Sequence, residues 1–361
     1  MKKRILNYSE FITERYSIDS NESLILEGGA AGHMKHPFDD KSLTFGDFKK
    51  LIEAGLQGEL NFEEEATEKT DGQNVFATVQ DGEVKFARNK GDMKNPMSLS
   101  QFKDKFDGHP SKLVQDTFSF AAEDLADSLN KLSSKDLEIF DNGKNFMNME
   151  LIYSKNPNVI YYDRDVIQFH GIKVTDGEGN IIGEETKYAN SIAKALKDLK
   201  LNIGKTFTVI PPQVIKLGKD IDFETNKNKF IKKVEDLKKK FDKEDVKKKQ
   251  KENIRPFEDL FLELGSVILK NASNFVAANP DKEMQRLHTQ IRTEADKIKK
   301  GGGAEQVNKV IAELDRLDRI GGIESIIPTE GVVFVYKGKV FKLTGTFAAI
   351  NQLMGIIKYG N

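Results

Sequence analysis

Two kinds of hydrophobic spacing alternate along this chain, and they constrain its fold more than any other feature. Between residues 66 and 90, apolar and polar residues alternate on both sides of the dipeptide Asp81-Gly82. The alternating apolar residues are Val75, Ala77, Val79, Val84 and Phe86. A period of two is typical of strands with one buried face, and Asp-Gly between two such runs predicts a β-hairpin.

Further strand-like runs occur at residues 146–153, 166–174, 206–214 and 331–343. Residues 219–320 instead show helical spacing, with apolar residues recurring every three or four positions. Members of this helical pattern are Phe257, Leu260, Phe261, Leu264, Val267, Ile268, Val307, Val310, Ile311, Leu314 and Leu317. The two patterns together predict an α+β fold built on antiparallel sheets, with a helical insertion.

The domain organisation follows from these shifts in pattern. At roughly 150 residues per domain, a chain of this length predicts about two domains. We expect an N-terminal helical and loop segment at residues 1–58, a domain formed by residues 59–218 and 321–361, and a helical insertion at residues 219–320. In the first segment, Thr44 begins a capping-box pattern and predicts the start of a helix.

Composition excludes several classes of protein. The 361 residues include 56 Lys and Arg against 57 Asp and Glu, so the formal net charge of −1 argues against a uniformly basic nucleic-acid coat. Because the chain has no Cys, disulfides, thiolate metal sites, iron–sulfur clusters and cysteine nucleophiles are excluded, which is consistent with a cytoplasmic location. Charges interrupt every long apolar run, so we expect no signal peptide and no membrane span.

Two further segments each allow a plain interpretation. Residues 230–252 are rich in Lys but contain interleaved acidic residues, so they fit either a solvated helix face or a nucleic-acid contact. His33 and His36 follow a Gly-rich stretch, and a loop is the simpler interpretation because two His without a third ligand rarely hold zinc.

The sequence Glu68-Lys69-Thr70-Asp71-Gly72-Gln73-Asn74, placed before the first strand of the hairpin, is the main functional signal. Lys69 is the candidate nucleophile, since a lysine amine attacks electrophiles once it is deprotonated. Alone, the K-x-D-G pattern is short and also fits a charged loop. The motifs that follow it along the chain give it weight. They are Ala87-Arg88-Asn89 and the segments 146–152, 166–172, 330–334 and 340–345.

In this order the motifs resemble the covalent nucleotidyltransferase superfamily, which includes ATP-dependent DNA ligases, RNA ligases and mRNA capping enzymes. The resemblance implies a ligase-type nucleotidyltransferase domain in which Lys69 attacks the α-phosphate of ATP and holds AMP. It implies that Glu330 serves the metal and Lys69, and that Lys342 contacts phosphate. The resemblance also implies that seven further residues contact the nucleotide or a phosphate: Glu68, Asp71, Gly72, Asn74, Arg88, Glu150 and Phe169.

Three of these residues have specific implied roles and equally plain alternatives. Arg88 would contact the 5′-phosphate of a polynucleotide, or is a hairpin-end charge. Glu150 would bind the ribose hydroxyl, or forms a cap or salt bridge. Phe169 would stack on the base, or is a core side chain.

The chemistry agrees with these implied roles. A lysine amine has an ordinary pKa of about 10.4, so nearby cations and partial burial are needed to make it a nucleophile. Lys342, Arg88 and a divalent ion would provide that field. Phosphoryl transfer depends mainly on positioning and electrostatic stabilisation, and Mg²⁺ (or Mn²⁺) prefers the oxygen ligands that Glu330 and phosphates supply.

Two details bear on the substrate. Asn74 stands where the resemblance to DNA ligases would require Arg, and the surrounding sequence resembles the RNA ligase branch, which favours RNA ends over DNA ends. Because 19 residues follow Lys342 (361 − 342), we expect no C-terminal OB-fold, and the helical insertion would have to supply any clamp.

Val340 is a departure from the family pattern, because a Lys is expected at its position. Lys339 would compensate from the opposite strand face, or one phosphate contact is lost. The leading expectation is an ATP-dependent RNA ligase that seals 5′-phosphate to 3′-hydroxyl ends. The alternatives are a DNA nick ligase with a helical clamp and a catalytically silent nucleic-acid-binding protein.

Overall fold

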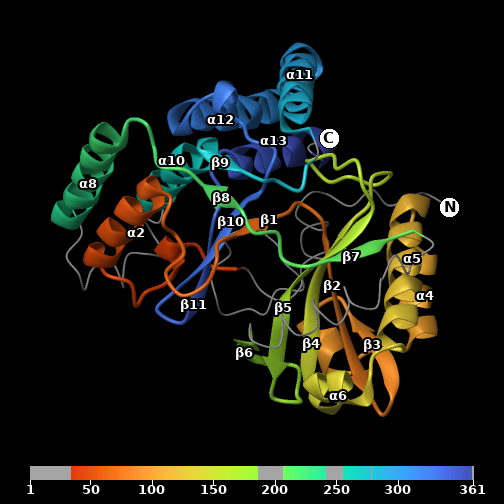
Figure 1. Ribbon diagram of the computed structural model, residues 1–361. Coiled ribbons are helices and arrows are strands. Elements are labelled where there is room, and N and C mark those ends of the chain that lie inside the picture. The colour runs from red at the N-terminus through yellow and green to blue at the C-terminus, as the bar shows by residue number, and fades with distance from the viewer. Residues whose placement is uncertain (1–33, 186–205, 241–254, 278, 360–361) are drawn as a thin grey trace. The chain divides into compact units, whose positions relative to one another are not determined.

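The computed structural model describes residues 34–185, 206–240, 255–277 and 279–359 (Figure 1). They form two compact units: unit 1 comprises the described parts of 34–69 and 214–359, and unit 2 those of 70–213. The helical residues 219–320 therefore share a unit with strands, and these boundaries differ from the expected ones. The Gly-rich stretch, His33 and residues 241–254 lie outside the described residues.

Unit 2 is built on a sheet with strand order β3-β2-β4-β5-β6, in which β7 pairs in parallel with β5. Its strands are β2 (Gln73–Gln80), β3 (Glu83–Ala87), β4 (Asn145–Ile152), β5 (Val166–Thr175), β6 (Ile181–Glu185) and β7 (Thr208–Ile210). Its helices are α3 (Lys90–Lys94), α4 (Leu99–Asp107), α5 (Lys112–Leu129), α6 (Ser134–Leu137) and the 3₁₀ helix η2 (Glu138–Gly143).

The hairpin expected from the alternating pattern is confirmed as β2 and β3. Gln80 pairs with Glu83, so the connection consists of Asp81 and Gly82 alone. These two residues have positive φ angles of 52° and 75°. A left-handed pair of this kind forms the type I′ turn, whose twist matches that of the two strands.

Helices α4 and α5 cover one face of this sheet (Figure 1). Alternate residues of the strands pack with these helices in one hydrophobic core. Among them are Val75, Ala77, Phe102, Phe118, Leu125, Met149 and Phe169. Because side chains along a strand alternate between faces, the residues between these core positions lie on the opposite face of the sheet.

Unit 1 contains a three-stranded antiparallel sheet with strand order β1-β10-β11 and a two-stranded sheet of β8 and β9. Its strands are β1 (Thr67–Lys69), β8 (Lys216–Leu217), β9 (Ala272–Ser273), β10 (Gly331–Tyr336) and β11 (Lys339–Leu343). Its helices are α2 (Phe45–Gln57), α8 (Phe223–Lys240), α10 (Arg255–Lys270), α11 (Pro280–Gly301), α12 (Ala304–Ile320), α13 (Phe347–Tyr359) and the 3₁₀ helices η1 (Pro37–Asp39) and η3 (Ile323–Ser325).

Helix α2 begins where the capping box predicts. The Thr44 hydroxyl accepts a hydrogen bond from the Asp47 amide, and the Asp47 carboxylate accepts one from the Thr44 amide. Helix α2 ends at Gly58, whose φ of 78° is left-handed. Both ends are therefore specified locally.

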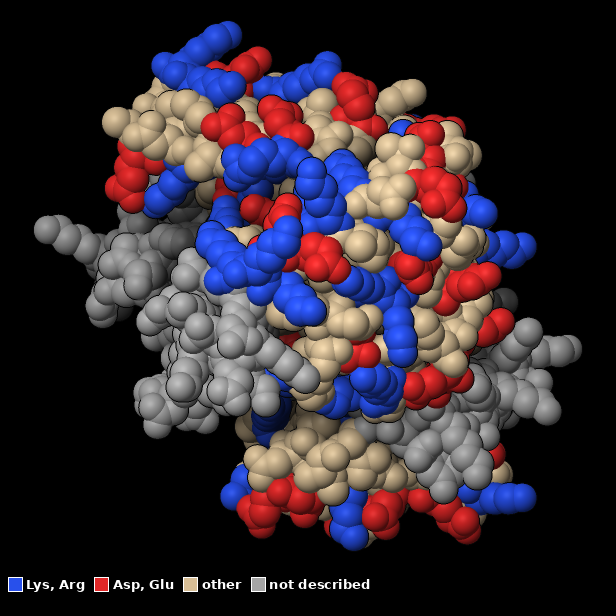
Figure 2. All heavy atoms as spheres, turned by 90° about the vertical axis from the view of Figure 1, so that its left-hand side faces the viewer, with Lys and Arg blue, Asp and Glu red and all other residues tan. Residues whose placement is uncertain are grey.

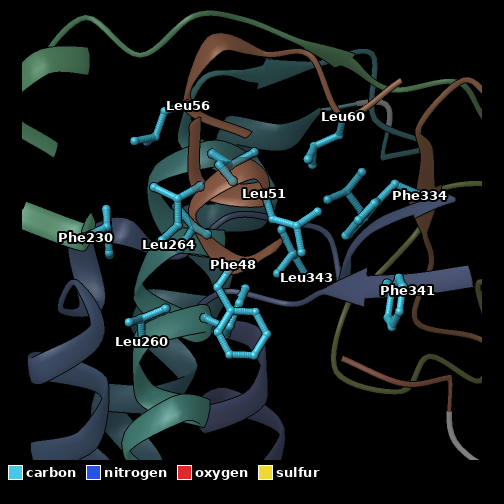
Figure 3. Close-up of a cluster of buried hydrophobic side chains, with 14 of the residues drawn as sticks. Phe48, Leu51, Leu56, Leu60, Phe230, Leu260, Leu264, Phe334, Phe341 and Leu343 are labelled. Atoms are coloured by element: carbon cyan, nitrogen blue, oxygen red, sulfur yellow. The ribbon is translucent and has the colours of Figure 1, made fainter. Parts of the chain in front are cut away.

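One hydrophobic core joins the helices of unit 1 to its three-stranded sheet (Figure 3). Side chains from α2, α8 and α10 pack against those of β10 and β11. The labelled members are Phe48, Leu51, Leu56, Leu60, Phe230, Leu260, Leu264, Phe334, Phe341 and Leu343. The helices bury their apolar faces on the strands, which is why the helical stretch does not form a unit of its own.

The Lys-rich helix α8 is tied to its neighbours by ion pairs. Lys227 lies 3.1 Å from Glu53 of α2, and Lys229 lies 2.6 Å from Glu263 of α10, which Lys233 also contacts. On the face that carries α2 and α8, basic and acidic side chains are intermixed (Figure 2). This arrangement matches the solvated-face interpretation for the described lysines, and contact with nucleic acid stays a prediction.

Candidate functional site

Lys69 and Glu330 form an ion pair although 261 positions separate them in the sequence (330 − 69). Lys69 is the last residue of β1 and pairs with Gly331, the first residue of β10. Glu330 immediately precedes β10 and therefore lies next to Lys69. The Lys69 Nζ lies 2.8 Å from a Glu330 carboxylate oxygen, with 18% and 15% of the two side chains exposed. Folding therefore brings the expected nucleophile and the expected metal-binding carboxylate together.

Lys342 lies on the same face of this sheet. Thr67 of β1 pairs with Val333 of β10, which pairs in turn with Lys342 of β11, so these three residues share one face. Lys69 is two residues beyond Thr67 and lies on that face as well. Lys342 is buried. Unit 1 thus carries two lysines on a single face of its sheet, and one of them, Lys69, is paired with the Glu330 carboxylate.

Two neighbours of Glu330 hold the strands in this arrangement. A Cβ atom on Gly331 would lie 2.1 Å from the Leu343 carbonyl oxygen, so glycine is required for β10 to approach β11 at this point. The Thr329 hydroxyl accepts a hydrogen bond from the Gly331 amide at 3.2 Å and lies 3.3 Å from the Lys69 carbonyl oxygen. The sequence analysis missed Thr329, which no family motif marks.

Glu68 lies on the other face of β1. It pairs with the core residue Val332, is fully buried, and accepts a hydrogen bond from the Val276 amide at 2.5 Å. A carboxylate that accepts a backbone N–H orders the loop that donates it. The structure therefore gives Glu68 a structural contact, and its expected nucleotide contact stays a prediction.

The next residues of the motif belong to unit 2. The Asp71 carboxylate accepts hydrogen bonds from the amides of Val159 and Ile160 at 2.7 and 2.8 Å, and the Asp71 amide donates to the Tyr162 hydroxyl at 2.9 Å. A Cβ atom on Gly72 would lie 2.7 Å from the Leu151 carbonyl oxygen. Asp71 and Gly72 thus position the chain against β4 and the loop that follows it.

Glu150 of β4 is the centre of a polar group on the face of the unit 2 sheet that α4 and α5 leave uncovered. Its carboxylate accepts a hydrogen bond from the Thr70 hydroxyl at 2.5 Å and lies 3.0 Å from His170 Nε2. Asn74 of β2 and Gln168 of β5 are its direct cross-strand neighbours. We call Asn74, Glu150 and Gln168 the polar row.

Sequence analysis missed the parts played by Thr70, Gln168 and His170 in this group. The sequence analysis assigned none of these three residues a role at the site. Strand alternation was the signal that could have found Gln168 and His170, because both residues sit at positions of the 166–174 run that share the face of Glu150.

Arg88 and Phe169 lie elsewhere. The Arg88 guanidinium carbon is 4.7 Å from the centroid of the Phe118 ring, which belongs to the core shared with α4 and α5. Phe169 is fully buried in that same core. Its placement matches the alternative of a core side chain, since a ring enclosed by core residues offers no free face to a base.

Lys339 has partners of its own. Its Nζ atom lies 2.7 Å from an Asp40 carboxylate oxygen and 2.8 Å from the Ser42 hydroxyl. It pairs with Tyr336 on the core side of β10, opposite to the face that carries Lys342. The hypothesis that Lys339 replaces the Lys expected at Val340 therefore finds no support in this geometry.

In unit 1 the carboxylate expected to bind a divalent ion, that of Glu330, lies beside Lys69. Within the described ranges, no group of three or more His, Asp or Glu residues is arranged to hold a metal ion. Mg²⁺ is commonly held by one or two carboxylates together with substrate phosphates, so Glu330 fits the donor set for an ion that arrives with a nucleotide.

Comparison with protein-family models, with curated proteins and with solved structures found no match to this chain. In the part of the chain that the structure describes, no helix has both the length and the apolar character that crossing a bilayer requires.

Proposed function

We propose that this protein is an ATP-dependent polynucleotide ligase, with RNA ends as the preferred substrate. The Lys69 amine forms a bond to the α-phosphorus of ATP while the bond to the pyrophosphate oxygen breaks. A polynucleotide 5′-phosphate oxygen then displaces Lys69 and takes the AMP. Finally, a 3′-hydroxyl displaces AMP and joins the two ends.

The proposal depends above all on the ion pair between Lys69 and Glu330 at 2.8 Å. A carboxylate beside an ammonium orients it but also favours its protonated form, whereas a second cation favours loss of the proton. Lys342, on the same face of the sheet, is that second cation. When bound, Mg²⁺ or Mn²⁺ would neutralise charge on the triphosphate oxygens.

Incubation with ATP labelled at the α-phosphate tests the proposal. We expect acid-labile label on the chain in the presence of Mg²⁺, and no label on Lys69→Ala or Lys69→Arg. Arginine keeps the positive charge beside Glu330 but is not a nucleophile, so Lys69→Arg separates nucleophilic attack from ion pairing. Lys233→Ala is the matched control, because Lys233 also pairs with a glutamate and should keep full labelling.

Substrate preference requires a second measurement with labelled nicks placed in RNA, DNA and hybrid duplexes. Sealing of RNA ends at least tenfold faster than DNA ends would agree with the proposal. Faster sealing of DNA nicks would replace it with the alternative of a DNA nick ligase.

A second candidate, a nucleic-acid-binding protein without catalysis, is favoured by one observation. Val340 supplies no cation, and Lys339 is held by Asp40 and Ser42. If no nucleoside triphosphate labels the wild-type chain while labelled RNA still binds to it, this candidate replaces the ligase.

A further inference from the structure

Thr329 is a buried residue whose hydroxyl contacts the backbone on both sides of the Lys69–Glu330 ion pair. Its relative exposure is 1%. The hydroxyl accepts a hydrogen bond from the Gly331 amide at 3.2 Å and lies within donating distance of two carbonyl oxygens, that of Lys69 at 3.3 Å and that of Gly331 at 3.2 Å. These residues all belong to unit 1. One side chain therefore joins the backbone of the candidate nucleophile to the backbone beside the candidate metal ligand.

The hydrogen bond from the Gly331 amide spans Glu330. A threonine hydroxyl that bonds to the backbone two residues further on closes a local turn, and the residue enclosed in that turn has restricted φ and ψ angles. Glu330 is the enclosed residue. Because the accessible side-chain rotamers depend on the backbone angles, this turn limits the directions in which the Glu330 carboxylate points.

The contact with the Lys69 carbonyl oxygen restrains the other member of the ion pair. Lys69 and Gly331 are the last pair of the β1–β10 ladder, and this segment of unit 1 ends at Lys69. The end of a strand opens more easily than its centre unless a further contact holds it. The Thr329 hydroxyl supplies such a contact, so both members of the ion pair are restrained by one group.

This side chain acts on the reaction through its neighbours. Thr329 is enclosed by protein, and its hydroxyl is bonded to backbone groups of Lys69 and Gly331. In reactions that depend on orientation, a displacement of about 1 Å in a reacting group lowers the rate roughly 100-fold. Transfer to the Lys69 amine therefore depends on how firmly this strand end is held.

We propose that Thr329 is a positioning residue for the transfer of AMP to Lys69, and that its hydroxyl holds the Lys69 amine beside the Glu330 carboxylate. The inference rests on the proposed function, since it assigns a role in that reaction. It concerns contacts within unit 1 alone.

The test measures the rate of AMP transfer to Lys69 at a series of ATP concentrations in Thr329→Val and Thr329→Ser. Valine keeps the shape of threonine without the hydroxyl, whereas serine keeps the hydroxyl. In Thr329→Val we expect the maximal rate constant to fall roughly 10- to 100-fold, because the amine is no longer held in place. The half-saturating ATP concentration should stay within about twofold of the wild type, because no substrate contact is removed. Thr329→Ser should recover most of the wild-type rate.

Thr175→Val is the matched control. Thr175 is 3% exposed at the end of β5, and its hydroxyl donates to the Lys144 carbonyl oxygen at 2.8 Å and accepts from the Gly177 amide at 3.5 Å. Its contacts are therefore of the same kind as those of Thr329. Thr175→Val should lose stability without slowing the transfer, whereas a merely structural role of Thr329 would leave both variants with the same rate.

Two further measurements do not require AMP transfer. Acetylation of lysines at pH 8, followed by mass spectrometry, should modify Lys69 about threefold faster in Thr329→Val, because an ammonium that loses its carboxylate partner gives up its proton more readily. Lys233, which also pairs with a glutamate, is the internal reference. In the wild type, hydrogen exchange should show a protected Gly331 amide, and this check does not depend on whether Thr329→Val folds.

Three results would overturn the inference: an unchanged maximal rate in Thr329→Val, an equal fall in Thr175→Val, or rapid exchange of the Gly331 amide. Failure of the inference is separable from failure of the proposed function. Label on Lys69 with an unchanged rate in Thr329→Val removes the inference alone. No label on the wild type, with faster acetylation of Lys69 in Thr329→Val but not in Thr329→Ser, removes the ligase and leaves the part of Thr329 in holding the ion pair.

Discussion

Glu68 and Lys69 are neighbours in the chain, yet their side chains have unrelated environments. Glu68 points to the core side of β1 and accepts a hydrogen bond from the Val276 amide. Lys69 points to the other face and forms an ion pair with Glu330. The same alternation separates Phe169, in the core, from Gln168, in the polar row. A single step along a strand therefore decides which face of the sheet a side chain lies on and which neighbours it contacts.

Gly331 gives a test at the scale of one residue. In Gly331→Ala the new Cβ atom would meet the Leu343 carbonyl oxygen at 2.1 Å, and β10 and β11 would have to separate. We expect a loss of about 2–3 kcal/mol in the free energy of unfolding, measured by urea denaturation, and loss of labelling at Lys69.

Gly355→Ala in α13 is the control for this substitution. A Cβ atom there has no neighbour within 4 Å, so the change should be neutral or stabilising. Equal stability of the two variants would show that the contact between β10 and β11 does not depend on glycine.

At the scale of elements, helices α10 and α12 are joined by a buried charge. Arg316 of α12 is 5% exposed and forms an ion pair with Glu258 of α10. It also lies 3.5 Å from Asp259 and 3.7 Å from Glu313. The Arg316 guanidinium is thus the counter-charge of three carboxylates. Its removal would leave their negative charges close together and partly desolvated.

The corresponding prediction concerns Arg316→Ala. We expect the free energy of unfolding to fall by roughly 3 kcal/mol, because the carboxylates lose their counter-charge. Arg319→Ala, at an exposed position of the same helix, should change stability little. Thermal and urea unfolding of both variants would check this, and a cost for Arg316→Ala no larger than that for Arg319→Ala would contradict it.

At the scale of the molecule, polar contacts in unit 1 join segments that are about 300 residues apart in the sequence. Asp40 accepts hydrogen bonds from Lys339 and Ser42, and Asp47 accepts one from the Tyr336 hydroxyl at 2.8 Å. These contacts join the segment around α2 to the β10–β11 hairpin. They accompany the hydrophobic core that the same elements share.

These contacts predict how stability depends on pH. Burial alone would raise the pKa of Asp40, but hydrogen bonds from Lys339 and Ser42 outweigh it and lower the pKa from 3.8 to about 2. A carboxyl whose pKa is depressed by folding stabilises the native state above its unfolded pKa. This stabilisation disappears as the pH falls from about 4 towards 2.

The measurement is urea unfolding of the wild type and Asp40→Asn at pH 7, 4 and 2.5. At pH 7 the variant should be less stable by at most about 2 kcal/mol, since Lys339 is partly exposed and its charge is screened. The difference should shrink at pH 2.5. A difference that stays constant across this range would show that the Asp40 charge does not contribute.

Much of the local structure could be predicted from the sequence. The hairpin at Asp81-Gly82 and the capping box at Thr44 both appear as expected, because turn and cap chemistry act over a few residues. The boundaries of the units could not be predicted, since they depend on which apolar faces meet in a shared core.

The candidate site divides in the same way. The residue types and their order marked Lys69, Glu330, Lys342 and Glu150, and chemistry suggested their roles. Only the tertiary structure decided that Lys69 forms an ion pair with Glu330, that Phe169 lies in a core, and that the buried Gln168 side chain has no hydrogen-bond partner among the described residues. Pairing between distant strands sets these relations, and a shift of one residue in register would reverse every face, which no local pattern specifies.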